Sequence, residues 1–597
     1  MAAPAAACQC CARLEAALRA NAVLLEGNRA LAARGAPASL DLVEAAVGVA
    51  GPACRGLSAL AARTDAALAG YAPHELAAAF AAAFLLYACV LAPLLRRVAE
   101  DVARSGRAQY LIDCFTALPG VRTLVRREKE KLFRKIGEEN RRAYDPGDPA
   151  VVALPKKGRP AREMRALLAV RQRGDCQWKE GASPMSGSVY MVGKEHLQLL
   201  NDCYAQFSFT NPLHGDSFPS VGRMEAEVVA MTAGLVGGGA GGVASVCGTM
   251  TSGGSESILC AMLASRDYAR ETRGIRRPEI VIGVSAHAAF YKAAEYFRMK
   301  LVRVPVGADG RLHARTAARY VTRNTAVIVG AAASYPHGVV DDIAGLSALA
   351  RRRGCLLHVD ACLGGFVLPF AKRLGYPVPE FEFSLPGVTS MSLDTHKFGM
   401  GHKGTSVVLF RHKALRRKQF TSITDWTGGL YISPSMAGSR SGGVVATAWC
   451  SMLHLGEAGY LALTDRMMKA TQRLIAGIDE IEGLEVIGKP DMVVVAWKSV
   501  DRRVNIYKVN DLMTQKGWHL CALQFPASLH MCLTAAHSNA LVDRLVADLR
   551  ACVKVLKADP KAIQGGMAPM YGMAASMPDR SSVGDVLAAY QDVMLEP

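Results

Sequence analysis

The 597-residue sequence predicts an α/β fold with a large domain built on a mostly parallel sheet, a smaller C-terminal α+β domain and an N-terminal transmembrane helix. Three observations predict this architecture. Short branched runs alternate with helical stretches from about residue 150 onward, the pattern changes after Gly429, and a long uncharged run stands near the N-terminus.

The alternation is clearest in the middle of the chain. Runs typical of buried strands cover Glu279–Val284, Thr325–Ala332 and Cys355–Ala361, while helical patterns cover Ser257–Glu271 and Ile343–Arg353. Strands that are separated by helices pair in parallel, and the helices cover both faces of the sheet. Later runs such as LEVIGKPDMVVVAW and ASLHMCLTA predict the smaller α+β domain.

The apolar run Leu76–Leu95 carries no charge and reaches the roughly 20 residues that cross a hydrocarbon core. Four arginines follow it between residues 96 and 107, whereas Arg63 is the only lysine or arginine at a comparable distance before it. The positive-inside rule therefore predicts a cytosolic C-terminal body and a luminal N-terminus. A buried helix of a soluble fold is the alternative, because the run is rich in alanine.

The formal net charge of +18 fits either nucleic acid or an anionic membrane surface and phosphorylated ligands. Basic patches interleaved with aromatic residues on a recognisable nucleic-acid module do not occur, which favours the second class of partner. The cysteines of the main body stand singly, mostly inside apolar runs, as reduced thiols do. Only Cys8, Cys10 and Cys11 cluster, and they have no His or further Cys at metal-ligand spacing nearby. We therefore expect neither a nucleic-acid partner nor a metal.

The strongest chemical signal is SMSLDTHKFGMGHKGTSVVLF, Ser390–Phe410, which places Lys397 directly after His396 on a Gly-rich turn between two predicted strands. An aldehyde cofactor needs an amine that a short turn holds within reach of its reactive carbon. Taken alone, an ordinary surface lysine is the better interpretation.

A second segment, HVDACLGG, places Asp360 at the carboxyl end of a predicted strand, where open α/β sheets bind ligands. A carboxylate there can pair with a pyridinium nitrogen and keep it protonated. Ala361 is small enough to let a flat ring lie close to the backbone. A helix N-cap aspartate is the alternative.

Two further segments complete the set. CGTMTSGGSESI runs from a Gly-rich turn into a helix at Gly254 and Ser255, and backbone N–H groups at a helix start can hold a phosphate. This is neither a Walker sequence nor G-x-G-x-x-G, so it does not indicate a nucleotide. In SAHAAFYKAA, His287 follows another predicted strand, where its ring can stack on a cofactor; a structural histidine is the alternative.

In the order phosphate loop, stacking histidine, aspartate and lysine, these segments resemble the group II decarboxylase-like branch of the fold-type I pyridoxal-phosphate (PLP) enzymes. Within that branch the chain is similar to the sphingosine-1-phosphate lyases. The likeness extends from about Arg126 to Gly572. It is carried by GSVYMV around Tyr190, NPLHGDSFPS, TSGGSESI, SAHAAFYKAA, HVDACLGGF, DTHKFG, TDWTGGLYISPSMAGSRSGG, NDLMTQKGWHL and LQFPASLH, and the N-terminal anchor also matches the eukaryotic members.

The resemblance implies PLP as the cofactor and a role for each matching residue. Lys397 is the implied lysine that condenses with the cofactor aldehyde, His287 the stacking ring and Asp360 the partner of the pyridine nitrogen. The implied holders of the cofactor phosphate are Gly254, Ser255 and His396, with Ser439 reaching it from a neighbouring subunit of a homodimer. The implied contacts of a substrate phosphate are Tyr190, His214, Lys403, Tyr335 and Arg440, and Tyr190 also counts among the catalytic residues.

The chain departs from the family pattern at a few of these positions. The family commonly has Tyr-Gly-Tyr after the lysine, where this chain has Phe398-Gly399-Met400. It commonly has proline at the position of Ser441 and threonine at the position of Ser255.

The implied reaction cleaves the C2–C3 bond of a phosphorylated sphingoid base by retro-aldol chemistry, giving a long-chain fatty aldehyde and phosphoethanolamine. Because a desolvated lysine near other cations has a lowered pKa, we expect Lys397 to act as a proton donor or base. A PLP-dependent amino-acid decarboxylase of the same fold is the alternative, and it needs neither a substrate-phosphate group nor an anchor. A catalytically silent protein is disfavoured because Lys397, Asp360, His287 and Ser255 are all present.

The predicted organisation has six parts and places the protein in the endoplasmic reticulum membrane as a single-pass protein. These parts are a luminal segment (1–75), the transmembrane helix (76–95), basic juxtamembrane linker helices (96–150), the first part of the catalytic body (151–240), the PLP-binding large domain (241–430) and the small C-terminal domain (431–597).

Overall fold

The structure is a computed structural model that describes residues 150–176, 183–239, 241–563 and 580–595, together with Arg127, Glu130, Lys131 and Arg134. The chain divides into two units, Met1–Val125 and Arg126–Pro597, and the described residues belong to the second. The predicted luminal segment and transmembrane helix lie outside the described residues. No helix within the described ranges combines the length and the apolar character that crossing a bilayer requires.

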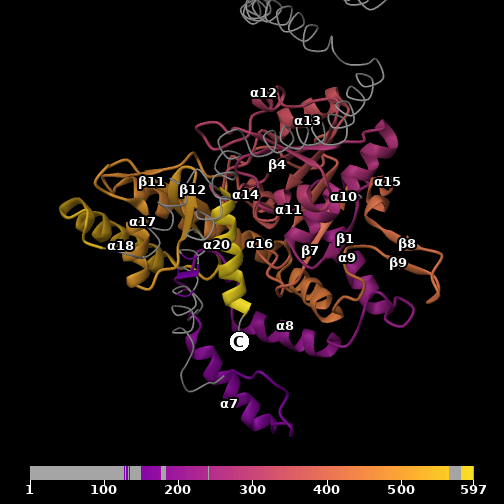
Figure 1. Ribbon diagram of the computed structural model, residues 1–597, viewed down its shortest axis with the longest axis horizontal. Helices are drawn as coiled ribbons and strands as arrows, with labels where there is room; N and C mark the ends of the chain where they lie inside the picture. The colour runs from indigo at the N-terminus through magenta and orange to yellow at the C-terminus, as the bar shows by residue number, and fades with distance from the viewer. Residues whose placement is uncertain are drawn as a thin grey trace, which may run out of the picture. The chain divides into compact units, whose positions relative to one another are not determined.

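A seven-stranded sheet forms the centre of the large domain (Figure 1). Its strands stand in the order β1-β7-β6-β5-β4-β2-β3, and β3, β2, β4, β5 and β6 pair in parallel, whereas β7 is antiparallel to both of its neighbours. The prediction of a mostly parallel sheet is confirmed. The strands are β1 (Cys247–Thr251), β2 (Glu279–Gly283), β3 (Lys300–Val304), β4 (Thr325–Ala331), β5 (Leu356–Asp360), β6 (Ser390–Leu393) and β7 (Ser406–Phe410).

Helices cover both faces of this sheet, because successive side chains of each strand point to opposite faces. Ile280 and Ile282 of β2 belong to one buried apolar cluster, while Val281 between them belongs to another. The helices around the sheet are α8 (Lys194–Phe207), α9 (Pro219–Leu235), α10 (Gly254–Arg273), α11 (Ala289–Tyr296), α12 (Ala314–Ala317), α13 (Ile343–Arg353), α14 (Leu368–Arg373) and α15 (Lys413–Arg416).

Local sequence sets the ends of the predicted helix α13. The Asp342 carboxylate accepts a hydrogen bond from the Gly345 N–H at 2.9 Å, which satisfies one of the free donors at the helix start. The helix ends at Gly354, whose φ of 63° is the left-handed conformation that glycine adopts without strain.

The smaller domain is built on an antiparallel sheet in the order β10-β11-β13-β12, as the later apolar runs predict. A separate hairpin, β8 (Thr421–Ile423) and β9 (Tyr431–Ser433), precedes it. The remaining elements are α7 (Ala161–Arg171), α16 (Gly442–Asp479), β10 (Leu484–Val486), β11 (Val494–Ser499), α17 (Ile506–Gln515), β12 (Cys521–Gln524), β13 (Ala527–Cys532), α18 (Asn539–Ala558) and α20 (Arg580–Leu595).

The direction of the strands decides where the chemical motifs meet. Since β1, β2, β4, β5 and β6 run the same way, the segments that follow them emerge at one edge of the sheet. These segments carry Gly254, His287, Tyr335, Asp360 and Lys397. The carboxyl edge of the sheet is the place where open α/β folds bind ligands.

Candidate active site

A cavity of about 450 Å³ opens among these segments. Its lining comes from the start of α10, the segment after β2, the segment after β5 and the β6–β7 turn. Six residues that the sequence analysis singled out line it together: Gly254, Ser255, His287, His396, Lys397 and Lys403. The structure therefore joins the phosphate loop, the stacking histidine and the lysine at one site.

The start of α10 offers free donors for an anion. The first amide N–H groups of a helix have no partner inside it, and the aligned peptide dipoles make this end positive. Ser255 lies in this first turn, and the turn faces His396, whose Nδ1–H donates to the Thr405 carbonyl oxygen. Burial lowers the pKa of the His396 ring. This arrangement suits a phosphate group.

Lys397 forms an ion pair that the sequence analysis did not anticipate. Its Nζ lies 2.7 Å from Oδ2 of Asp394, which is almost completely buried. Neither oxygen of Asp394 has an aligned hydrogen-bond donor among the described residues, so the attraction rests on the proximity of opposite charges. Asp394 stands three positions before the lysine in DTHKFG, a motif from which only His396 and Lys397 had been singled out.

This ion pair corrects the expectation of a lowered lysine pKa. Burial by itself lowers the pKa of Lys397, but the Asp394 carboxylate and, less strongly, Asp360 raise it above its ordinary value. The expectation was wrong because it considered desolvation and nearby cations without the buried carboxylate three residues away. The ion pair therefore favours the ammonium form of Lys397.

Asp360 ends β5 and lies close enough to Lys397 to affect its pKa. One of its oxygens, Oδ1, accepts hydrogen bonds from the Cys362 N–H at 3.1 Å and the Ser392 hydroxyl at 3.4 Å. The other oxygen accepts none from the described residues, which leaves it for a donor on a bound group. Ala361 beside it is fully buried.

The residues fit PLP by the chemistry of their donors. A helix start with a hydroxyl suits the phosphate, a lysine amine suits the aldehyde, and a carboxylate with a free oxygen suits a ring N–H. Among the described residues, no group of His, Cys, Asp and Glu is arranged to hold a metal ion.

Of the predicted substrate contacts, Lys403 lines the cavity, while Tyr190 and Tyr335 contact residues that line it. Lys403 lines it and places Nζ 4.6 Å from the centroid of the Tyr190 ring, a cation–π distance. Burial, then the neighbouring Lys397, lowers the pKa of Lys403. The Tyr335 ring meets His287 edge-on with centroids 6.4 Å apart. These three side chains can meet an anionic substrate end.

His214 and Ser439 are not brought to this cavity by the single chain. His214 is exposed in the loop between α8 and α9, and Ser439 is exposed in the segment before α16. Neither residue is among those that line the cavity around Lys397.

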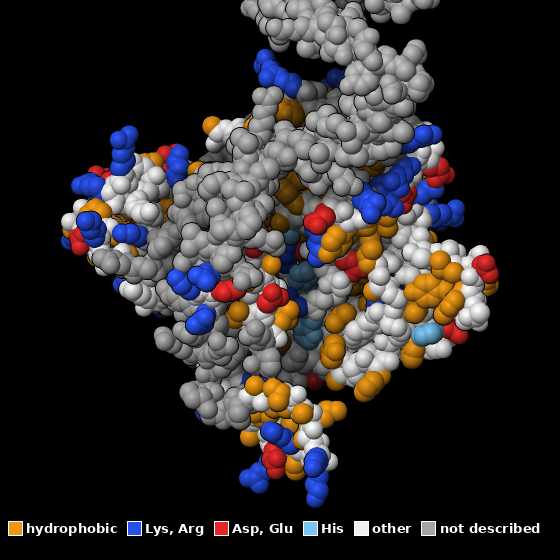
Figure 2. Space-filling view, in the orientation of Figure 1, with side chains coloured by type: hydrophobic (Ala, Val, Ile, Leu, Met, Phe, Trp, Pro, Cys, Tyr) orange, Lys and Arg blue, Asp and Glu red, His pale blue; other side chains and the backbone are white. Residues whose placement is uncertain are grey.

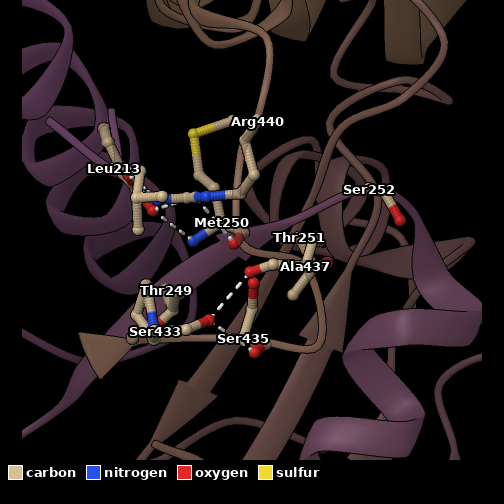
Figure 3. Close-up of polar contacts among 12 residues, drawn as sticks. Leu213, Thr249, Met250, Thr251, Ser252, Ser433, Ser435, Ala437 and Arg440 are labelled. Atoms are coloured by element: carbon tan, nitrogen blue, oxygen red, sulfur yellow. Dashed lines mark hydrogen bonds and ion pairs between the residues drawn. The ribbon is translucent and has the colours of Figure 1, made fainter. Parts of the chain in front are cut away.

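Arg440 is the clearest difference from the sequence analysis. Its guanidinium donates to both carboxylate oxygens of Glu225 on α9, at 2.7 and 2.8 Å, and to the Met250 carbonyl of β1 at 3.2 Å. Figure 3 shows Arg440 directed toward Met250, while Ser252, which leads into α10, lies apart from it. It lines a different cavity, and its charge is already neutralised, so within one chain it is a structural cross-link and not a phosphate ligand.

Comparisons with known proteins show the family of this chain. A family model described as the pyridoxal-dependent decarboxylase conserved domain matches residues 175–500. The sphingosine-1-phosphate lyase of Arabidopsis thaliana is 45% identical over 516 residues, covering 85% of this chain and 92% of that protein. The lyase of Rattus norvegicus is 41% identical, covering 74% of this chain and 77% of that protein.

The chain belongs to the sphingosine-1-phosphate lyase family.

Solved structures show the same relation. The sphingosine-1-phosphate lyase of Burkholderia pseudomallei superposes with a TM-score of 0.67 at 37% identity, covering 75% of this chain and 98% of that one. Glutamate decarboxylase of Lactobacillus brevis superposes with a TM-score of 0.59 at 21% identity, covering 70% and 97%, and shares the fold. The fold-type I PLP decarboxylase-like architecture predicted for the body is confirmed.

The departure of this lyase at Phe398 has a structural consequence. Phe398 is almost fully buried and packs edge-on against Tyr190, with ring centroids 5.0 Å apart, so it contacts Tyr190 without offering a hydroxyl. Cys362 is a lining residue that sequence reasoning missed, although it follows Asp360 and Ala361 in the same motif. Burial, with Asp360 and Asp394, raises the pKa of its thiol well above the ordinary value.

Proposed function

We infer that this protein is a PLP-dependent aldehyde-lyase that cleaves the C2–C3 bond of phosphorylated sphingoid bases, giving a long-chain fatty aldehyde and phosphoethanolamine. The observation that carries this function is the single cavity in which Lys397, the α10 start and Lys403 meet. The relatives that cover most of the chain are named as sphingosine-1-phosphate lyases, so an amino-acid decarboxylase is not favoured.

Pyridoxal phosphate, when bound, supplies an aldehyde for a lysine amine and a ring that takes up the electron pair of the broken bond. Ser255, the N–H groups of the α10 start and His396 would hold its phosphate, and Asp360 would accept a hydrogen bond from the ring N–H. Asp394 orients the Lys397 ammonium at 2.7 Å and keeps its proton on Nζ until the amine is needed. Lys397 then holds or returns a proton beside the substrate C2.

The substrate phosphate needs its own positive group, separate from that of the cofactor. Lys403 supplies it from the β6–β7 turn, where its Nζ lies over the Tyr190 ring, and Tyr335 contacts His287 of the same cavity. An ammonium and a phosphate oxygen form a charge-assisted hydrogen bond, which is roughly twice as strong as a neutral one. Such a group distinguishes a lyase for phosphorylated substrates from a decarboxylase.

The test replaces Lys397 with alanine in the full chain. We expect Lys397→Ala to lose the absorbance band of the lysine-bound cofactor and all release of fatty aldehyde from sphingosine 1-phosphate. The matched control Lys413→Ala removes an exposed lysine of α15. We expect it to keep both the absorbance band and the release of aldehyde. Carbon dioxide release in place of aldehyde contradicts the lyase assignment, and full turnover by Lys397→Ala contradicts the role of the lysine.

We further propose a homodimer in which Ser439 of one subunit reaches the cofactor phosphate of the other. Ser439 is exposed, and the β8–β9 hairpin just before it exposes Trp426, Leu430 and Ile432 to 57%, 86% and 62%. Figure 2 shows apolar side chains gathered over this hairpin. An apolar group of this kind on an exposed hairpin supports a contact with a second subunit.

The proposed anchor is the apolar run Leu76–Leu95, with the N-terminus in the lumen of the endoplasmic reticulum and the catalytic body in the cytosol. Its uncharged length and the arginines that follow it support this topology. A lipid substrate partitions into the bilayer, so an anchored enzyme meets it at the surface.

A further inference from the structure

A second cluster of reactive side chains stands beside the cavity, on the sheet of the small domain. Cys521 of β12 pairs directly with His530 of β13, and side chains that are directly opposite in an antiparallel pair share one face. His530 is fully buried, whereas Cys521 is partly exposed. A thiol and an imidazole are therefore neighbours at a position that solvent reaches.

The hydrogen bonds of His530 fix which nitrogen can take up a proton. Nδ1 lies 3.1 Å from the Pro336 carbonyl oxygen, which can only accept, so Nδ1 carries the hydrogen of the neutral ring. Nε2 then holds the lone pair, and it has no hydrogen-bond partner among the described residues. A buried imidazole nitrogen without a partner, beside a thiol, is the arrangement that activates cysteine nucleophiles.

Cys521 differs from the other partly exposed cysteines. Burial by itself raises its pKa, but the neighbouring His530 ring and the Tyr335 hydroxyl lower it to about 7. Burial raises the pKa of Cys203 to about 11 and that of Cys450 above its ordinary value. The thiolate is the nucleophilic form, so these three thiols differ strongly in reactivity at neutral pH.

The cluster is connected to the cavity through Tyr335, whose ring contacts both His530 and the lining residue His287. The Tyr335 ring lies edge-on to His530 at 4.8 Å on one side and to His287 at 6.4 Å on the other. A group attached to Cys521 is therefore expected to press against Tyr335. This ring stands between the thiol and His287, the residue expected to stack on the cofactor.

We propose that Cys521 and His530 form a nucleophilic thiol site for α,β-unsaturated aldehydes, and that the adduct lowers turnover. His530 Nε2 takes the thiol proton, the sulfur bonds to the β-carbon of the aldehyde, and the α-carbon receives a proton from the imidazolium. No atom is lost and no oxidant is needed. The substrate class rests on the proposed function, because a sphingoid base with a double bond next to C3 releases such an aldehyde.

The first experiment separates this site from turnover. The full-chain Lys397→Ala variant, which cannot generate aldehyde, is treated with trans-2-hexenal at pH 7, reduced with borohydride and examined by peptide mass spectrometry. We expect one hexenal on Cys521, with Cys203 and Cys450 alkylated at least about tenfold more slowly because their thiolate fractions are small. Equal rates at the three cysteines overturn the proposal.

The second experiment tests the base. His530→Asn keeps an amide N–H for the Pro336 carbonyl and removes the nitrogen that takes up the proton. We expect alkylation of Cys521 to slow about tenfold in this variant, as the thiol returns toward an ordinary pKa. An unchanged rate in a variant that retains its circular dichroism spectrum overturns the role of His530.

The third experiment uses the enzyme's own product. We expect turnover of sphingosine 1-phosphate to label Cys521 and slow progressively, and turnover of the saturated sphinganine 1-phosphate to do neither. We expect Cys521→Ser to keep a constant rate of turnover with both substrates. If hexenal labels Cys521 but neither substrate releases aldehyde, the proposed function is contradicted and the thiol site is still supported. If Cys521→Ser loses activity during turnover of sphingosine 1-phosphate as fast as the unmodified chain does, the proposal of a thiol site is wrong.

Discussion

Gly254 shows how closely the residues of the site are packed. A Cβ at this position would lie 2.8 Å from both carboxylate oxygens of Asp394 and 2.8 Å from the Cys362 sulfur. Contacts of this length force a shift, and Asp394 cannot shift without changing its ion pair with Lys397. The phosphate loop and the lysine are thus coupled through one carboxylate.

We predict that Gly254→Ala weakens PLP binding about tenfold or more, since overpacking of this kind costs about 1–3 kcal/mol. Titration of the apoenzyme with PLP, followed by absorbance, measures the effect. Gly253→Ala is the matched control, because a Cβ there meets only His396 Cε1 at 3.9 Å. Equal affinities for the two variants would show that Asp394 moves freely.

At the scale of elements, Arg440 connects three parts of the large domain. Its bidentate pair with Glu225 joins the segment before α16 to α9, and its bond to the Met250 carbonyl joins the same segment to β1. Both side chains are mostly buried, at 12% and 15% exposure. Removing one partner of such a pair leaves an uncompensated charge in a poorly hydrated place.

We predict that Arg440→Met destabilises the protein by about 3 kcal/mol, the lower end of the range for a broken buried pair, because a little exposure remains. The double variant Arg440→Met with Glu225→Leu recovers part of this loss, as urea unfolding of the variants will measure. The KM of the double variant for the phosphorylated substrate stays close to that of the unmodified chain. A large rise in its KM without any change in stability would show that Arg440 binds the substrate phosphate.

The whole chain adds an anchor to the catalytic body in our proposal. We predict that the full chain sediments with membranes and resists extraction at alkaline pH. The paired change Leu85→Arg and Leu86→Arg releases it, because arginine at the centre of a span costs roughly 2.5–3.5 kcal/mol per residue. The control pair Leu85→Val and Leu86→Val stays in the membrane fraction. Membrane association of the arginine variant would falsify anchoring through this run.

The α/β class and most of the site could be predicted because their signals are local. Strands, helix caps and Gly-rich turns are short contiguous patterns. Residues such as His287, Asp360 and Lys397 each stand at the end of one predicted strand or soon after it. Parallel strands then bring their carboxyl ends to one edge, so the proximity of these residues follows from chain direction.

The remaining features depend on distances that no contiguous pattern contains. Arg440 lies 215 positions from Glu225 in the chain, and only their meeting decides that its charge is already neutralised. The pKa of Lys397 likewise depends on the 2.7 Å between its nitrogen and Asp394, which a motif three residues apart does not specify.

By itself the sequence determined the family and the cofactor chemistry and predicted the residues that carry it, because these reside in the identity and order of side chains along the chain. The tertiary structure alone decided which cations are free to meet a ligand and which thiol faces a buried imidazole. Electrostatic energy and proton affinity depend on separation and burial, and both arise only when distant segments pack together.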